Sequence, residues 1–354
     1  MGSRLGVVIK DTLGWELYYD HWSAQTIGAD IAIDGVEATL KRVREMRRMG
    51  IDSPHLWLGA VDIEGSLLID LTTQTVVWAE ESEGLYLPRI INSLIQLTWP
   101  GWDAAWSPEG ARGVLAAAGV DPTTIFTDTT YNTRALKDHT WFGPWDDSPG
   151  DDAFSVALDD GRLILWRGIT YLDILAELGP DSIRRIAEKV LERSGTDEPT
   201  RWDDRPPTRN PVSGVCVDFR TKTLRWWSLL NDDHGLEAFA ALWPGWTIQS
   251  KGDNYEWHQR VLGRNLRNWT DDVIECRKTI TRLINEGMRE NPAVSILGHL
   301  SDSGVDVKIN APVFDTVPSD RAAQSDLVLS FLNALQTSSP QPPARFVDRE
   351  GTVH

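Results

Sequence analysis

The sequence is poor in cysteine and contains no long apolar run. It has 2 cysteines in 354 residues, and no stretch reaches the roughly 20 apolar residues that a spanning helix needs. Two thiols make no disulfide framework, and Cys216 and Cys276 lie in segments typical of a buried strand and a helix, so we expect small core residues. Because the first residues also lack the apolar core of a signal peptide, we expect a cytoplasmic protein without membrane contact.

Motifs for catalysis and metal binding are missing as well. The sequence has no Gly-rich phosphate loop and no Gly-x-Ser-x-Gly elbow. Its 7 histidines include no pair at i, i+4, and no Cys-x-x-Cys occurs, so we expect neither a metal site nor a cofactor. These absences weaken an enzyme hypothesis without excluding it.

Basic charge is scarce. The 52 acidic and 35 basic residues give a formal charge of −17. Such a field opposes nucleic acid and anionic membranes and favours a basic protein partner. The oligomeric state does not follow from it. Tryptophan is abundant, with 17 residues beside 8 phenylalanines and 6 tyrosines, and it is enriched in cores and binding surfaces alike.

An internal repeat organises the chain. Trp99-Pro100-Gly101-Trp102 recurs as Trp243-Pro244-Gly245-Trp246. Three further blocks follow in the same order: 14–19 with 161–166, 35–46 with 179–190, and 70–78 with 218–226. Four collinear blocks indicate the duplication of one module.

The hydrophobic pattern of each copy predicts strand–strand–helix–strand–strand–helix–strand–helix. This order is typical of an α/β protein of the α+β type, with an antiparallel or mixed sheet and helices packed on it. In the first copy we expect a helix over 36–49. We divide the chain into a first module (1–120), an acidic connector (121–151), a second module (152–263), a C-terminal extension (264–336) and a disordered tail (337–354).

Within the extension, the pattern predicts a helix that begins at Thr270 and another over 322–335. Between them, 294–300 and 305–309 flank Ser301-Asp302-Ser303-Gly304, which we interpret as a β-hairpin. The extension is therefore expected to be a helix-hairpin-helix.

Asp20-His21-Trp22 is the most suggestive cluster for chemistry. A carboxylate beside a histidine can orient a general base, and the second module has no such cluster. The alternative is that His21 fixes the loop before a helix. We keep Asp20 and His21 as a candidate site in a cleft between the modules.

Tryptophans and acidic side chains are the candidates for binding. The paired Trp-Pro-Gly-Trp segments can be ligand clamps or, more economically, helix stops whose indoles pack on the sheet. Asp70 and Asp218 are expected to cap turns. Acidic clusters can serve solubility or steer a basic partner. The candidate binding residues are Trp22, Glu80, Glu81, Glu83, Trp145, Asp146, Asp147 and Trp202.

Tyr18-Tyr19-Asp20-His21-Trp22, together with the first Trp-Pro-Gly-Trp segment, gives the first module a family resemblance. Over about Gly6 to Gly119 it resembles a group of bacterial, mainly actinobacterial, proteins in which these motifs carry no catalytic signature. Small acidic bacterial proteins of this kind often serve as immunity proteins for toxins, so the resemblance implies an immunity protein by analogy of class.

Two hypotheses of function remain. The first is a non-enzymatic binding protein, in particular a cytoplasmic immunity protein that blocks a basic toxin domain. The second is an enzyme or small-ligand-binding protein with its site at Asp20 and His21.

Overall fold

The computed structural model describes two compact units. One unit is Met1–Tyr131 with Trp269–His354, and the other is Asn132–Asn268. The described residues are 3–49, 63–80, 86–121, 152–168, 172–194, 210–230, 236–286, 292–303, 311–314, 316–319 and 321–354.

The first unit contains a mixed six-stranded sheet in the order β3-β2-β1-β4-β5-β6. The neighbours β1/β4 and β5/β6 are parallel, and the other neighbours are antiparallel. The strands are β1 (Leu5–Asp11), β2 (Gly14–Asp20), β3 (Arg47–Met49), β4 (Gly65–Asp70), β5 (Thr75–Glu80) and β6 (Asp103–Trp106).

The second unit repeats five of these six strands. Its order is β11-β10-β9-β7-β8, and β7/β9 and β10/β11 are the parallel pairs. Among the described residues of the second unit, β3 alone has no counterpart. The protein is therefore an α/β protein with two similar sheet modules, as the repeat predicts. The strands are β7 (Asp152–Ala157), β8 (Leu163–Gly168), β9 (Ser213–Asp218), β10 (Thr223–Ser228) and β11 (Thr247–Ser250).

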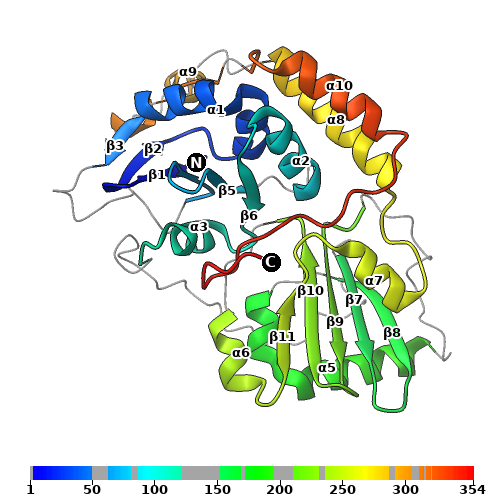
Figure 1. The fold of residues 1–354 in the computed structure, drawn as a ribbon. Helices are drawn as coiled ribbons and strands as arrows, with labels where there is room; N and C mark the ends of the chain where they lie inside the picture. Colours follow the sequence, from blue (N-terminus) through cyan, green and yellow to red (C-terminus); the bar gives the residue numbers. More distant parts are fainter. Residues whose placement is uncertain are drawn as a thin grey trace. The chain divides into compact units, whose positions relative to one another are not determined.

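The helices of the two modules match as well (Figure 1). In the first module, α1 (Ile27–Glu45) and α2 (Pro88–Thr98) pack together, and α3 (Gly110–Ala118) packs on β1, β4 and β5. In the second, α5 (Leu172–Ser194) packs with α6 (Leu236–Leu242), and α7 (Tyr255–Leu262) packs on β9 and β10. Within each module the element order is the predicted one, and the first module has β3 in addition.

α1 and α5 both bend at a glycine. Gly35 (φ 73°) and Gly179 (φ 69°) have a backbone that side-chain-bearing residues rarely adopt. The sequence shows helical spacing only after each glycine, so our prediction missed the helical turns before it. The expected helix over 36–49 also ends too late. The observed helix α1 ends at Glu45. Arg47–Met49 instead forms the edge strand β3, in which Met49 pairs with Leu17 of β2 and is buried.

The Trp-Pro-Gly-Trp segments end α2 and α6, and their first indoles are buried. Trp99 donates from Nε1 to the carbonyl of Ile31 (2.9 Å), and Trp243 donates to that of Ala176 (3.1 Å). In each motif the two indoles lie edge to face, 5.1 Å and 5.0 Å between ring centres. The interpretation as a helix stop with packed tryptophans is confirmed.

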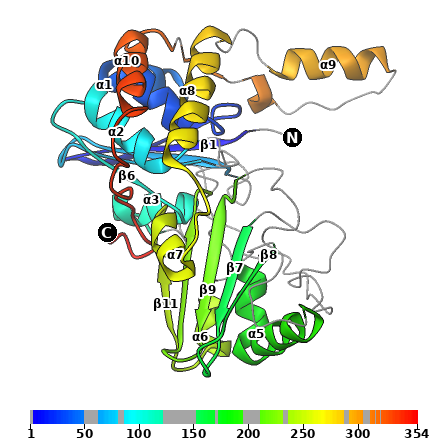
Figure 2. The same cartoon turned by 90° about the vertical axis from the view of Figure 1, so that its right-hand side faces the viewer.

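From Trp269 onward, the C-terminal extension belongs to the first unit. α8 (Trp269–Glu286) packs against α10 (Ser325–Leu335), and α10 also contacts α1 and α2. The expected hairpin is wrong over its first strand, because Pro292–Asp302 forms the helix α9, and the turn η3 (Ala311–Phe314) follows. Pro292 suits the first turn of a helix, and the 3–4 spacing of apolar residues outweighs the β-branched ones. Figure 2 shows α9 projecting from the α8–α10 layer. The remaining part, 305–309, lies outside the described residues.

The tail over 337–354 is not disordered, contrary to the sequence prediction. Trp106 of β6 donates its N–H to the carbonyl of Arg345 (2.9 Å) and accepts from the N–H of Val347 (2.8 Å). The side chain of Val347 is fully buried in the core under α3. The proline-rich and charged composition of the tail predicts disorder and does not indicate that the tail covers the edge strand β6. Within the described ranges, no helix is long and apolar enough to cross a membrane.

We expect Val347→Ala to lower the free energy of unfolding of the first unit by about 1–3 kcal/mol, because it leaves a cavity in a closed core. Chemical denaturation measures this loss. Val353→Ala, at a 43% exposed position of the same tail, is the control and is expected to change stability little. Equal effects of the two substitutions would show that the tail is not packed.

Candidate functional site

Asp20 does not orient His21. The Asp20 side chain is 1% exposed, and its oxygens accept from the N–H of Trp22 (2.8 Å), the N–H of Val317 (2.8 Å) and the hydroxyl of Thr316 (3.3 Å). The bonds from Val317 and Thr316 place the end of β2 against the C-terminal extension, whereas the bond from Trp22 is local. Asp20 therefore joins the extension to the first module.

His21 pairs with a tyrosine. Its Nδ1 lies 2.9 Å from the hydroxyl of Tyr19, and its ring meets that of Trp22 edge to face at 5.0 Å. Burial and the charge of Arg4 lower the pKa of His21, so the imidazole is neutral near pH 7. Burial raises the pKa of Tyr19 to about 12. A neutral pair of this kind fixes the loop, as the second reading of His21 predicts.

The other described candidates also have internal partners. Trp22 donates from Nε1 to the carbonyl of Val313 (2.8 Å), so it ties the same loop to η3. Glu80 is 1% exposed; it accepts from the N–H of Gly28 (2.7 Å) at the start of α1 and from the hydroxyl of Tyr86. A buried helix cap cannot steer a partner, so Glu80 as a binding residue is a wrong prediction. The remaining candidates lie outside the described residues: Glu81, Glu83, Trp145, Asp146, Asp147 and Trp202.

A partly open pocket of about 380 Å³ lies beside Asp20 within the first unit. Tyr19 and Asp20 of β2, residues 45–47, and Phe314, Thr316 and Val317 of the extension line it. The extension thus completes a small polar and apolar hollow at the end of β2.

A buried ion-pair network in the first unit was missed from the sequence. Arg321 donates from Nε to Asp30 (2.7 Å), which Arg42 also contacts at 3.4 Å. Arg42 lies 3.5 Å from Asp34. All four side chains are at most 8% exposed. Two carboxylates and two guanidinium groups balance in charge, which a buried cluster requires.

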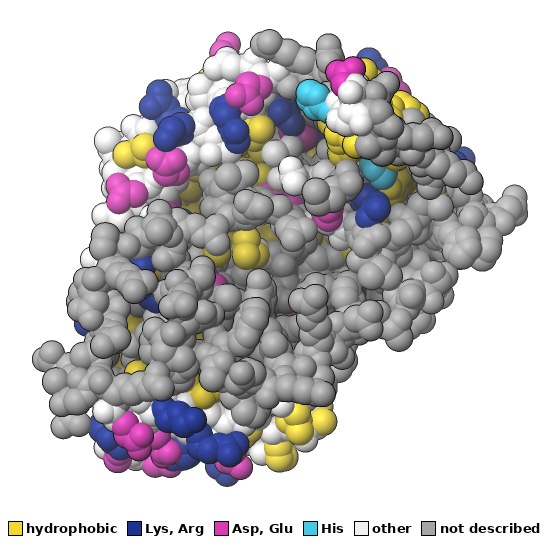
Figure 3. All heavy atoms as spheres, turned by 180° about the vertical axis from the view of Figure 1, so that it is seen from behind, with side chains coloured by type: hydrophobic (Ala, Val, Ile, Leu, Met, Phe, Trp, Pro, Cys, Tyr) yellow, Lys and Arg dark blue, Asp and Glu magenta, His cyan; other side chains and the backbone are white. Residues whose placement is uncertain are grey.

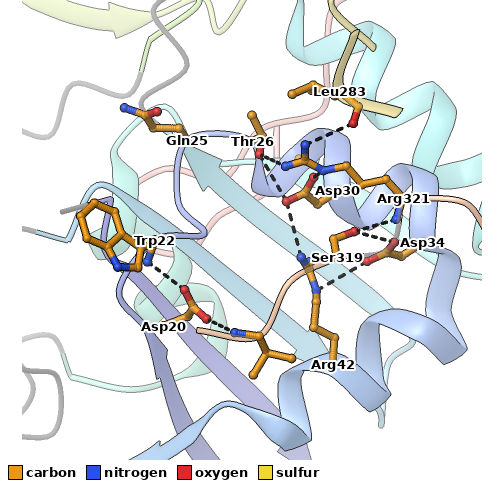
Figure 4. A network of polar contacts seen from close by, with 12 residues as sticks. Asp20, Trp22, Gln25, Thr26, Asp30, Asp34, Arg42, Leu283, Ser319 and Arg321 are labelled. Carbon is orange, nitrogen blue, oxygen red and sulfur yellow. Dashed lines mark hydrogen bonds and ion pairs between the residues drawn. The ribbon is translucent and has the colours of Figure 1, made fainter. Parts of the chain in front are cut away.

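Neutral groups complete this network (Figure 4). Arg321 also donates to the carbonyl of Leu283 (3.3 Å) and the hydroxyl of Thr26 (3.0 Å), and Ser319 donates to Asp34 (2.8 Å). The network thereby joins α1, α8 and the segment before α10. Asp30 and Arg321 lie 291 residues apart in sequence, so no local pattern could have revealed their contact.

The second unit contains a buried Ser–His contact that resembles a nucleophile and its base. The Nε2 of His258 lies 2.7 Å from the hydroxyl of Ser155, and Trp227 donates from Nε1 to His258 Nδ1 (3.1 Å). Because the indole can only donate, Nδ1 is the acceptor and Nε2 carries the proton. His258 thus donates to Ser155, which in turn donates to the carbonyl of Val215 (3.3 Å). This direction does not activate a serine.

Burial lowers the pKa of His258 to about 3, consistent with a neutral structural ring. Gly214 makes room for it, since a Cβ there would lie 2.8 Å from His258 Nδ1. Among the described residues, no three His, Cys, Asp or Glu side chains group as a metal site.

A scan against family models and searches of curated proteins and of solved structures found no match to this chain.

We expect Arg321→Met to destabilise the first unit by about 3–5 kcal/mol, because it leaves a buried carboxylate partly unpaired. Urea denaturation measures the change. The double variant Asp30→Asn/Arg321→Met should recover part of the loss. Arg48→Met, which breaks an exposed pair with Glu16, is the control and should have a much smaller effect. A loss no larger than that of the control would contradict a closed network.

His258 makes the stability of the second unit depend on pH. Its folded pKa lies below the unfolded value, so its contribution is complete above about pH 6.5 and declines as the pH falls toward 3. Between about pH 7 and pH 4.5 the expected loss is on the order of 2–3 kcal/mol. Denaturation at both pH values should show this loss diminished in His258→Gln and retained in His299→Gln, an exposed control.

Proposed function

We propose that this protein is a non-enzymatic binding protein, in particular a cytoplasmic immunity protein that blocks a basic toxin domain. The observation that carries this proposal is that the described candidates for catalysis serve as structural residues inside the fold. Asp20, His21, Ser155 and His258 each hold a fixed hydrogen bond inside the fold. A protein that acts by occlusion needs no such group to be free.

The distribution of charge supports a basic partner. Several exposed acids in the described part face a cation of the same unit, as Asp159 faces Arg184 (2.7 Å) and Asp160 faces Arg162 (2.6 Å). Figure 3, which shows the molecule from behind, likewise shows basic side chains beside acidic ones in the described areas of this face. Most of the −17 formal charge is contributed by residues outside the described ranges, which include 81–85, 122–151 and 231–235.

Acidic segments accelerate the association with a basic protein, because long-range attraction raises the rate of encounter. The resemblance of the first module to bacterial proteins without a catalytic signature is consistent with this role. The charge distribution and the resemblance both point to a basic protein as the class of partner, and neither identifies the individual protein.

The pocket beside Asp20 favours a second candidate, a small-ligand-binding protein or an enzyme. Asp20 and Tyr19 reach its wall, and His21 is bonded to Tyr19. Against an acid–base role, the carboxylate of Asp20 is already occupied by three donors. This candidate therefore ranks behind the first.

Co-expression with the product of the neighbouring gene tests the first candidate. We expect the protein to rescue cells from that product and to form a complex with it on gel filtration. The rate of association should fall as the salt concentration rises, since steering is screened. No rescue together with no complex would remove the proposal.

We expect Asp146→Asn/Asp147→Asn to slow this association. Asp159→Asn/Asp160→Asn is the matched control, because these acids are paired with Arg184 and Arg162, and it should leave the rate nearly unchanged. Stopped-flow mixing measures both. Equal rates for the two double variants would assign the steering charge to other segments.

A further inference from the structure

One row of side chains crosses the first sheet under α3. The strand registers place Leu17, Val8, Leu68, Val77 and Ala105 next to one another, from β2 to β6. All five are buried members of the core that α3 covers. In the first module this face of the sheet is purely apolar along the row.

The same row in the second module is polar. The registers place Leu165, Ser155, Cys216, Arg225 and Gln249 side by side, from β8 to β11. Four aliphatic positions of the first module are thus serine, cysteine, arginine and glutamine here. Placing such groups on a sheet face under a helix is costly unless they find partners.

The inner part of the row has its partners. Ser155 is bonded to His258 of α7 and to the carbonyl of Val215. Burial raises the pKa of the Cys216 thiol to about 11, so it remains neutral. This part of the face needs nothing from outside.

The outer part of the row lacks such partners. Arg225 and Lys251 both approach the ring of Trp257 on α7, with Arg225 Cζ at 5.8 Å and Lys251 Nζ at 5.9 Å from its centre. The Nε atom of Arg225 is buried without a hydrogen-bond partner. Within the described part of the chain, no carboxylate lies within ion-pair distance of either cation. Burial and the charge of Arg225 lower the pKa of Lys251, as an uncompensated pair of cations would.

These three positions are specific to the second module. The matched elements put Val77, Ser107 and Gly113 where it has Arg225, Lys251 and Trp257. Gly113 leaves room for Ser107 and the tail, since a Cβ there would lie 2.3 Å from the Ser107 hydroxyl oxygen and 3.3 Å from the carbonyl oxygens of Val347 and Asp348. Trp257 fills the corresponding space and holds the two cations at the edge of the sheet instead.

We propose that Arg225, Lys251 and Gln249 form a binding site for a phosphate group, free or as the monoester of a small molecule. A phosphate dianion matches two adjacent cations in charge, and its oxygens accept from the guanidinium, the ammonium and the amide. Gln249 is exposed and Arg225 and Lys251 are half-buried, so a small anion can reach all three side chains from solvent. The proposal is independent of the toxin-inhibitor function.

Isothermal titration of the full chain tests this site. Inorganic phosphate and glycerol 3-phosphate are the two probes, each against sodium chloride at equal ionic strength. We expect saturable binding of at least one probe, and about tenfold or more weaker binding in Arg225→Gln. Binding of the monoester but not of inorganic phosphate would identify a small-molecule ester as the source.

Arg220→Gln is the matched control, since this arginine lies on the neighbouring turn and pairs with Asp218 at 2.9 Å. The Arg220→Gln variant should bind each probe with the affinity of the unmodified protein. If Arg225→Gln does not fold by circular dichroism, Lys251→Gln replaces it, with the same expected loss. The proposal is overturned by no binding beyond the chloride control, by equal affinity of Arg225→Gln, by equal loss in Arg220→Gln, or by binding of a single-stranded oligonucleotide alone.

Discussion

The hydrogen bond from a buried indole to a carbonyl of the bent helix fixes the helical layer of both modules. Trp99 and Trp243 each end one helix and reach back to the turn before the glycine bend of another. A buried indole N–H without a partner would cost about 1–3 kcal/mol. The bend at Gly35 brings α1 close to the end of α2, where a Cβ would lie 3.2 Å from the carbonyl oxygen of Thr98. One motif and one glycine thus set the distance between two helices, and that distance determines how they cover the sheet.

The sequence predicted the features that are local or repeated. Asp70 and Asp218 cap their turns as expected, by accepting from the backbone N–H groups of Thr72 and Arg220. The order of strands and helices within each module followed from periodicity. What could not be predicted depends on distant partners. The role of Arg321 requires Asp30, and the burial of Val347 requires β6, and no spacing rule connects such residues.

The candidate site illustrates the same limit. Asp20 is the last residue of β2, and His21 follows it in a bend. Asp20 contacts the extension, whereas His21 contacts Tyr19. Two adjacent residues that look like a catalytic pair therefore have different partners, whereas the Ser–His contact that does form joins residues 103 positions apart in sequence.

The connection of the extension to the first module has a consequence for synthesis on the ribosome. Asp20, Asp30 and Trp106 lack the partners that the C-terminal segment supplies until residues 316–347 have been translated. The second module, which lies wholly between these segments in the chain, emerges with all of its strands earlier. N-terminal domains usually fold first, but here the second module can complete its sheet while the edge of β6 in the first module is still open.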